Sequence, residues 1–231
     1  MRSTPASIDH GAATPAKAPA PQRTVVTLHA VAEQAAGCRE CPIGFIGTQT
    51  VWGEEPVGAP LMLVGEQPGD HEDLQGRPFV GPAGMLLERA LQQLHWPRER
   101  LYVTNAVKHF KYELRGKRRM HKTPVQREIE ACNHWLESEI ELVQPQAIVA
   151  LGATAARATI GRAVAVMSMR GQWLQREADG LPVLITLHPS ALLRLRGGDR
   201  DQAFAAWLRD LQQATGHVAR AGGNDDTRLS G

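Results

Sequence analysis

Short runs of consecutive apolar residues alternate along the chain with longer segments in which apolar residues recur at helical spacing. Four runs are continuous and bounded by Gly, Pro or polar residues: 60–65, 101–104, 147–152 and 182–187. Such runs are typical of strands that are buried on both faces of a parallel sheet. Four segments have helical spacing: 82–94, 124–142, 153–160 and 199–213. Strands separated by helices predict an α/β protein, a three-layer α/β/α sandwich with a central, mainly parallel four-stranded sheet.

The two ends of the chain lack this pattern. Residues 1–24 are rich in Ala, Pro, Ser and Thr and have almost no periodic apolar positions, so we expect a disordered leader. Residues 216–231 are rich in Gly, Asp and Arg and have no apolar face, so we expect a flexible tail after one folded domain at 25–215. No apolar run approaches the length of a membrane span, and no signal-peptide pattern follows Arg2. We therefore expect a cytoplasmic protein that makes no contact with a membrane. We also expect a monomer.

The overall charge is nearly balanced, because 26 Lys and Arg against 24 Asp and Glu give a formal net charge of +2. A nucleic-acid-binding surface would therefore be a local patch. One segment forms such a patch: Lys117, Arg118, Arg119, Met120, His121 and Lys122. Four fixed positive charges suit a phosphate backbone, and the histidine is the only member that can act as a nucleophile or base near neutral pH. A basic run is also typical of a solvated loop or a localisation signal.

Polar side chains follow three of the four predicted strands. Glu66, Gln67, Gly69 and Asp70 come after the first strand, Asn105 ends the second, and the fourth is followed by His188 and Ser190. In a parallel sheet, ligands bind outside the carboxyl ends of the strands. Each residue alone would be typical of a turn or a helix cap. The convergence of a carboxylate, an amide and an imidazole at one edge indicates an active site.

The cysteines indicate a separate site. Cys38 and Cys41 form a C-x-x-C before the first strand, and Cys132 lies in the segment predicted as a helix from residue 124. An odd number of cysteines without a secretion signal argues against a disulfide framework and favours metal binding or redox chemistry. His109 is a candidate fourth ligand, either for zinc or for an iron–sulfur cluster. His134 is a poorer candidate, and three unconnected thiols are the remaining alternative.

The ordered set of these motifs resembles the iron–sulfur uracil-DNA glycosylases of the uracil-DNA glycosylase superfamily. The resemblance extends from about Val31 to Trp207 and includes these segments: Cys38 to Cys41, 65–69, 78–81, 104–108, Cys132 and 188–190. The basic segment 117–122 resembles the insertion of the UdgX group, whose members attach themselves covalently to DNA after they remove uracil. Gln67 resembles the same group, as does His109, which stands where ordinary members carry cysteine. Met120 replaces the isoleucine expected there, a swap that conserves volume.

The resemblance implies a role for each residue of the site. Phe79 stacks on the base, Asn105 reads N3 and O4 of uracil, and His188 donates a hydrogen bond toward O2. His121, oriented by Glu66, replaces water and bonds to C1′ of the sugar. The substrate-binding set is completed by Gln67, Gly69, Asp70 and Ser190, with Ser190 on a flanking phosphate. Lys117, Arg118, Arg119 and Lys122 bring their loop onto the DNA backbone, and Arg119 also braces the loop internally.

The same resemblance implies a [4Fe–4S] cluster held by four ligands: Cys38, Cys41, His109 and Cys132. The implied partner is uracil-containing DNA, which we expect to be single-stranded, and we expect the protein at the nucleoid. Two other functions remain as alternatives to the covalent glycosylase. The first is a conventional hydrolytic iron–sulfur uracil-DNA glycosylase that turns over. The second is a non-catalytic, metal-stabilised nucleic-acid-binding module.

Overall fold

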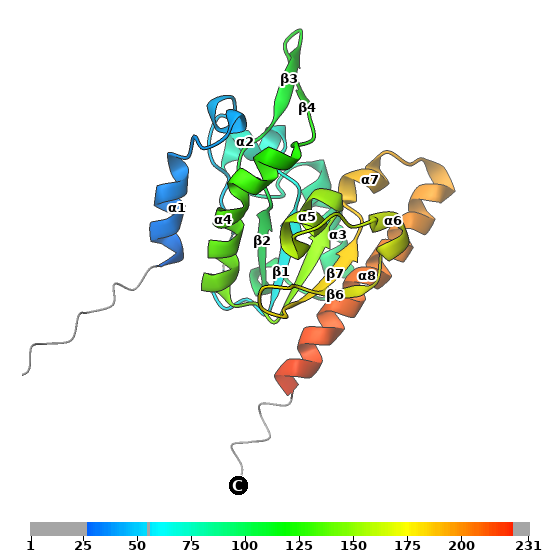
Figure 1. Ribbon diagram of the computed structural model, residues 1–231. Coiled ribbons are helices and arrows are strands. Elements are labelled where there is room, and N and C mark those ends of the chain that lie inside the picture. The colour runs from blue at the N-terminus through cyan, green and yellow to red at the C-terminus, as the bar shows by residue number, and fades with distance from the viewer. Residues whose placement is uncertain (1–26, 55, 224–231) are drawn as a thin grey trace, which may run out of the picture.

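The computed structural model describes residues 27–54 and 56–223 (Figure 1). The predicted leader at 1–24 and the last part of the predicted tail, 224–231, lie outside the described residues. Within the described ranges, no helix is both long and apolar enough to cross a membrane.

A five-stranded sheet forms the centre of the molecule, with the strand order β2-β1-β5-β7-β6 (Figure 1). Its four parallel strands are those predicted from the apolar runs: β1 (Leu61–Gly65), β2 (Leu101–Asn105), β5 (Ala147–Leu151) and β7 (Pro182–Thr186). The predicted number of four strands is wrong, because β6 (Trp173–Gln175) pairs antiparallel with β7 at one edge. This strand has only three residues, all partly or fully exposed, so it has no continuous apolar run.

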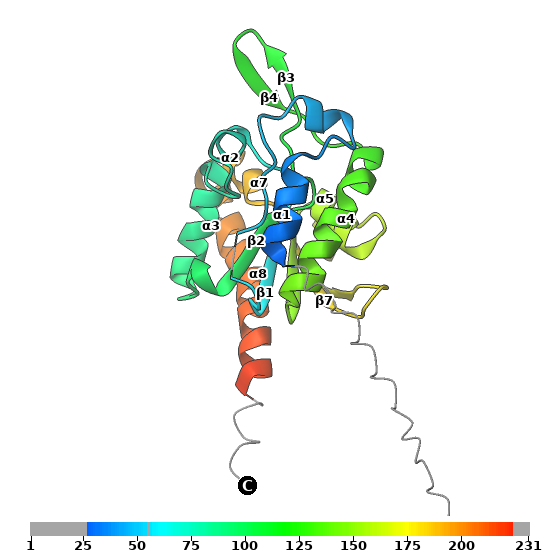
Figure 2. The same cartoon turned by 90° about the vertical axis from the view of Figure 1, so that its left-hand side faces the viewer.

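Helices cover both faces of the sheet, which confirms the three-layer sandwich (Figure 2). One hydrophobic core lies under these helices: α1 (Leu28–Ala36), α4 (Gln126–Val143) and α5 (Ala153–Ile160). The other core lies under these: α3 (Pro82–Gln93), α7 (Pro189–Leu193) and α8 (Gly197–Gly223). Four short elements complete the fold: η1 (Pro42–Phe45), α2 (Asp70–Gln75), η2 (Arg98–Arg100) and α6 (Val166–Met169).

The helix boundaries follow local chemistry. Pro82 occupies the first turn of α3, where its missing N–H costs no hydrogen bond. Glu128 accepts a hydrogen bond from the backbone N–H of Val125 and so caps the start of α4. Helix α8 continues past the expected domain boundary at 215 to Gly223. Helix α1 was not predicted; its nine residues lie before the first strand, outside the alternation of strands and helices on which the prediction depended.

A β-hairpin projects from the carboxyl end of the sheet (Figures 1 and 2). It consists of β3 (Tyr112–Arg115) and β4 (Arg118–His121), paired antiparallel around a turn at Gly116 and Lys117. Gly116 has φ of +60°, a backbone conformation that suits glycine in a tight hairpin turn. The basic segment 117–122, predicted as a loop, is therefore mostly a strand. His121 is the last residue of that strand.

Candidate active site

The carboxyl ends of three parallel strands bring the predicted polar residues to one edge of the sheet. Gly65 ends β1 and pairs in register with Asn105 at the end of β2. A side chain at Gly65 would collide with the amide oxygen of Asn105 and with the ring of Phe79. Glycine at this position therefore allows Phe79 and Asn105 to lie against each other beside the backbone of β1.

Asn105 and Phe79 form the wall of the site that suits a planar base. Asn105 is 2% exposed, and its carboxamide has no hydrogen-bond partner among the residues that the structure describes. Phe79 is 6% exposed, and its ring centroid lies 5.8 Å from that of His188. Its backbone has φ of +54°, an unusual value for an aromatic residue and a conformation that often occurs at functional sites. An amide without a partner beside a buried ring can accept and donate hydrogen bonds to a base edge.

His188 is held as a neutral hydrogen-bond donor. Its Nδ1 accepts the backbone N–H of Ser190 at 3.2 Å and lies 2.8 Å from the Ser190 hydroxyl. A neutral ring whose Nδ1 is an acceptor carries its proton on Nε2. Burial lowers the pKa of His188 to about 4; the nearby Glu66 opposes this effect, whereas His121 and Arg194 add to it. Ser190 thus fixes the tautomer of His188, in addition to its predicted role at a phosphate.

Glu66 orients the histidine of the hairpin. Its Oε1 lies 3.1 Å from His121 Nε2, and its Oε2 accepts a hydrogen bond from the Thr154 hydroxyl at 2.7 Å. Burial raises the pKa of Glu66, but the hydrogen bonds from His121 and Thr154 outweigh it and hold the pKa below its ordinary value. The side chain of His121 is 45% exposed, so a substrate can reach the ring. The structure therefore brings Glu66 and His121 together from segments that are far apart in the sequence.

Arg119 anchors the hairpin to the body of the domain. Its guanidinium lies 2.5 Å from Asp70 Oδ1 and 2.6 Å from Asp73 Oδ2, and it also donates to the Thr48 hydroxyl. The prediction that Asp70 binds substrate is not supported by this geometry, because its carboxylate faces Arg119. The guanidinium of Arg119 also faces the protein, in agreement with its predicted bracing role. Its other predicted role was to bind DNA.

Gln67 is a second anchor for the hairpin. Its amide nitrogen donates to the backbone oxygens of Lys111 and Lys122, and its amide oxygen accepts the N–H of Lys111. The side chain therefore fastens both ends of the hairpin, whereas the sequence predicted a contact with substrate. Gly69, also predicted to bind substrate, is the N-cap of α2, and its N–H donates to Glu72.

The remaining cations of the hairpin face solvent. Lys117 and Arg118 are exposed at the tip, and Lys122 lies 2.9 Å from Glu113 in an exposed ion pair. Met120 is 37% exposed. The hairpin thus presents His121 toward Glu66 and most of its positive charge to the outside.

The three cysteines gather between the loop before β1 and α4. Cys132 Sγ accepts the backbone N–H of Lys108 at 3.3 Å, and Cys38 Sγ accepts the indole N–H of Trp135 at 3.4 Å. Burial raises the pKa of Cys132 to about 12; Lys108 opposes this rise, and Cys41 and Cys38 add to it through their proximity. N–H donors to sulfur are typical surroundings of iron–sulfur clusters.

His109 directly follows Lys108, whose backbone N–H contacts Cys132, but the ring of His109 has another partner. Its Nε2 lies 3.0 Å from the Thr50 hydroxyl, and burial lowers its pKa, with a smaller effect from Arg39. Among the described residues, no three His, Cys, Asp or Glu side chains approach closely enough to hold a metal ion. The thiols are of the type that binds soft metals and two of them accept N–H donors, but the predicted four-ligand set stays a prediction.

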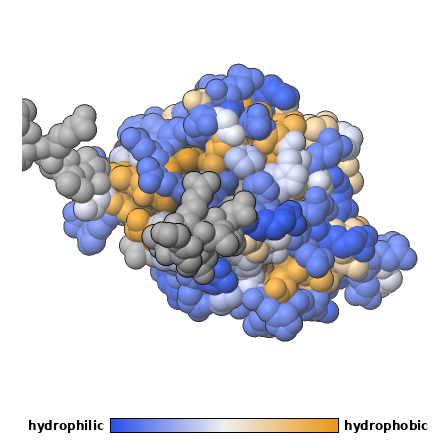
Figure 3. Space-filling model, turned by 90° about the horizontal axis from the view of Figure 1, so that it is seen from below, coloured by the Kyte–Doolittle hydropathy of each residue, from blue (hydrophilic) through white to orange (hydrophobic). Residues whose placement is uncertain are grey.

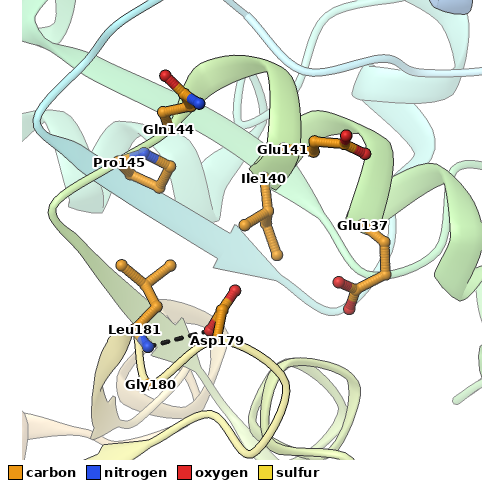
Figure 4. Close-up of a pocket in the computed structure, with 8 residues that line it drawn as sticks. All are labelled: Glu137, Ile140, Glu141, Gln144, Pro145, Asp179, Gly180 and Leu181. Atoms are coloured by element: carbon orange, nitrogen blue, oxygen red, sulfur yellow. Dashed lines mark hydrogen bonds between the residues drawn. The ribbon is translucent and has the colours of Figure 1, made fainter.

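Well away from these residues, a hollow of about 430 Å³ lies between the end of α4 and the turn before β7 (Figure 4). Its polar groups include the carboxylates of Glu137, Glu141 and Asp179, and Asp179 accepts the N–H of Leu181. It lies at the amino ends of the strands and contains no predicted site residue. Figure 3 shows that end of the molecule as a mixture of hydrophilic and hydrophobic residues. We therefore assign the active site to the opposite, carboxyl end.

Thr154 and Asp73 are site residues that the sequence analysis missed. Thr154 follows β5, the predicted strand whose carboxyl end had no acidic, amide or imidazole side chain to attract attention. The position itself was a usable signal, because all parallel strands end at the same edge. Asp73 carries no such signal, since its role depends on Arg119, which is distant in sequence.

Comparison with known proteins agrees with the family resemblance of the sequence motifs. The family model of the uracil-DNA glycosylase superfamily matches residues 52–212. A type-4 uracil-DNA glycosylase of Thermotoga maritima is 36% identical over 199 residues, which cover 84% of this chain and 96% of the relative. A type-4 uracil-DNA glycosylase of Pyrobaculum aerophilum is 37% identical over 169 residues, which cover 69% of this chain and 83% of that relative.

Proposed function

Because this chain belongs to the uracil-DNA glycosylase superfamily, we propose that it removes uracil from DNA and that His121 then bonds to the abasic sugar. The pairing of His121 Nε2 with Glu66 Oε1 at 3.1 Å carries the second part of the proposal. In a hydrolytic enzyme, a water molecule would need to reach the sugar. Here an anchored hairpin holds an imidazole beside the carboxylate instead.

The base-binding step uses Phe79, Asn105 and His188. A uracil flipped out of a stack or presented in single-stranded DNA lies against Phe79. The free carboxamide of Asn105 accepts from N3–H and donates to O4, whereas cytosine presents the opposite pattern at that edge. His188 Nε2–H donates toward O2, where negative charge develops as the base leaves. Its lowered pKa of about 4 keeps it a neutral donor at physiological pH.

The bond-forming step uses His121 and Glu66. The electron pair of the N-glycosidic bond leaves with uracil, which gives the sugar positive charge at C1′. An imidazole that donates one N–H to a carboxylate keeps a lone pair on its other nitrogen. That lone pair forms the bond to C1′. The product is an alkylated imidazolium, and its charge is balanced by Glu66, whose lowered pKa keeps it ionised.

The tip of the hairpin supplies contacts to the DNA backbone. Lys117 and Arg118 are exposed there, and Arg194 lies near the opposite side of the site, at the end of α7. The nearly balanced net charge of +2 means that this local patch must supply the attraction to phosphates. We propose single-stranded DNA as the preferred substrate, since the site then receives an unstacked base without a cost of unpairing.

We also propose that Cys38, Cys41, Cys132 and His109 hold a [4Fe–4S] cluster. The proximity of Cys38 and Cys41 to Cys132, which contributes to the raised pKa of Cys132, and the N–H donors to two of the thiols support this assignment. Bound there, the cluster would join the segment before β1 to α4 and to the chain that follows β2. The four ligand residues would stabilise the domain next to Asn105, and they take no part in the reaction itself.

Incubation with a uracil-containing oligonucleotide, followed by a denaturing gel, tests the proposed function. The wild-type protein should give a band shifted by the mass of the DNA, and thymine-containing DNA should give none. His121→Ser should abolish the shifted band and retain uracil release, because Asn105 and His188 are unchanged. Release of many uracils per protein without a shifted band would instead identify a hydrolytic glycosylase. DNA binding without any uracil release would identify a binding module.

A further inference from the structure

A buried cation, Lys108, lies directly behind Asn105. The side chain of Lys108 is fully buried, and its Nζ lies 2.7 Å from the backbone oxygen of Asn105. The same nitrogen lies 2.7 Å from the Thr104 hydroxyl and 2.6 Å from Glu139 Oε2. An ammonium group has three N–H donors. All three are therefore used inside the protein, and one of them holds the backbone of the residue that faces the base.

Glu139 on α4 is the counter-charge of Lys108. Its side chain is also fully buried, and its Oε1 accepts hydrogen bonds from the backbone N–H of Gly53 and the hydroxyl of Tyr102. The Thr104 hydroxyl donates to the same carboxylate. A buried ion pair adds little net stability, but a fully hydrogen-bonded one can fix a single conformation of its neighbours.

Two features make the direction of Asn105 dependent on this network. Strand β2 is at the edge of the sheet and ends at Asn105, so strand pairing supports this residue from one side only. The carboxamide of Asn105 also has no hydrogen-bond partner in the described part of the chain. The orientation of the amide is therefore set by its backbone, and Lys108 fixes that backbone at the carbonyl.

We propose that Lys108, held by Glu139 and Thr104, is a positioning residue that sets the direction in which the Asn105 carboxamide faces the base. Lys108 is fully buried and touches no DNA, so it acts on discrimination between bases through Asn105 alone. This inference rests on the proposed function, in which Asn105 reads uracil.

The test compares two double variants in which a buried ion pair is removed. Lys108→Met with Glu139→Gln removes both charges, because Lys108→Met alone would leave a buried carboxylate without a partner. Arg176→Met with Glu137→Gln is the matched control, since that pair has a 2.6 Å ion pair and an Arg176 side chain that is 3% exposed. Glu137 lies only two residues before Glu139 on α4, but residues at this spacing face different sides of a helix. Single-turnover uracil release is measured against DNA concentration for oligonucleotides that contain uracil or 4-thiouracil. Thermal melting of each variant gives the loss of stability.

The Lys108/Glu139 variant should release uracil more slowly by on the order of 100-fold, with a half-saturating DNA concentration within about twofold of wild type. Its ratio of rates for uracil and 4-thiouracil should fall toward one, because a loosely held amide no longer distinguishes the atom at position 4. The control should keep the wild-type ratio even if it melts at a lower temperature. A wild-type rate and ratio in the Lys108/Glu139 variant would overturn the inference, whereas an inactive wild-type protein would overturn the proposed function.

A milder variant covers the case in which the double variant does not fold. Thr104→Val keeps the ion pair and removes one of the three acceptors of the ammonium group. We expect uracil release to slow by about tenfold, with a reduced discrimination between uracil and 4-thiouracil. Unchanged discrimination in a folded Thr104→Val protein would also contradict the inference.

Discussion

The two histidines of the site have different environments and therefore different chemistry. His188 is buried and its Nδ1 accepts hydrogen bonds from Ser190, so its remaining N–H, on Nε2, is available to an acceptor from a bound molecule. His121 is 45% exposed and lies against the carboxylate of Glu66. The first environment suits a neutral donor to a leaving group, and the second suits a nucleophile whose product is charged.

The lowered pKa of His188 predicts a specific dependence of stability on pH. The unfolded chain takes up a proton near the ordinary pKa of 6.5, whereas the folded protein resists it until pH about 4. Between these values the unfolded state binds more protons, so the free energy of unfolding falls as the pH falls. His188→Gln should reduce this dependence in melting curves at pH 7, 5.5 and 4. His29→Gln, whose parent side chain is 80% exposed, should not. Equal slopes for His188→Gln and wild type would contradict the assignment.

Because the carboxamide of Asn105 is free to contact the base, replacing its NH₂ group by an oxygen should strongly reduce the rate of uracil release. Asn105→Asp removes the amide donor and places a carboxylate in a position that is 2% exposed. We expect uracil release to slow by about 100-fold or more, because the donor to O4 is lost and a buried charge is added. Asn133→Asp on α4 is the control and should keep wild-type release. Undiminished release by Asn105→Asp would show that another residue reads the base.

The placement of residues that directly follow a strand could be predicted from the sequence, and contacts that depend on distant partners could not. Glu66, Asn105 and His188 each follow a predicted strand, and parallel strands end at one edge. Gln67 and Asp70 follow a strand in the same way. Their partners, however, lie on the hairpin, which the sequence analysis did not predict as strands.

At the scale of elements, the hairpin of β3 and β4 places His121 beside Glu66. Two strands alone are marginally stable in water, so a hairpin that holds His121 in a fixed position needs anchors. Arg119 supplies one through Asp70 and Asp73, and Gln67 supplies another at the hairpin base. His121 ends β4 beside both anchors, and this places its ring at Glu66.

Arg119→Ala should therefore separate the two steps of the reaction. Loss of the ion pairs to Asp70 and Asp73 loosens the hairpin, so the covalent adduct should form at least about tenfold more slowly. Uracil release should continue, because Asn105 and His188 lie on other elements. Arg118→Ala is the matched control, since this exposed neighbour lies on the other face of β4 and should affect only DNA affinity. The rates of both steps are measured on the same oligonucleotide; equal adduct rates for the two variants would refute the anchoring role.

The elements that were missed share a physical cause. Strands β3, β4 and β6 are short and largely exposed, so burial imposes no continuous apolar run on their sequences. The parallel strands are buried on both faces, and for this reason they were predicted almost to the residue. Pairing of an exposed strand depends on turn geometry and on tertiary anchors such as Arg119, neither of which has a periodic signature.

At the scale of the whole molecule, the thiol site joins parts of the chain that the sheet does not connect directly. Cys38 and Cys41 lie before β1, and Cys132 lies on α4. We expect protein purified without air to be brown and to contain about four iron atoms per chain. Cys132→Ser should lose iron and melt lower by about 5 °C or more, a shift that corresponds to roughly 2 kcal/mol for a domain of this size. Asn133→Ser should match wild type. Colourless wild-type protein with stoichiometric zinc would contradict the cluster.

The most direct test of the account is the mass of the protein after reaction with uracil-containing single-stranded DNA under denaturing conditions. Attachment through His121 predicts a mass equal to protein plus oligonucleotide minus uracil, with the modification mapped to the peptide that carries His121. The His121→Ser protein should keep its original mass while free uracil accumulates. An unmodified wild-type protein that releases several uracils per molecule, or a modification mapped to another residue, would contradict the central role of His121.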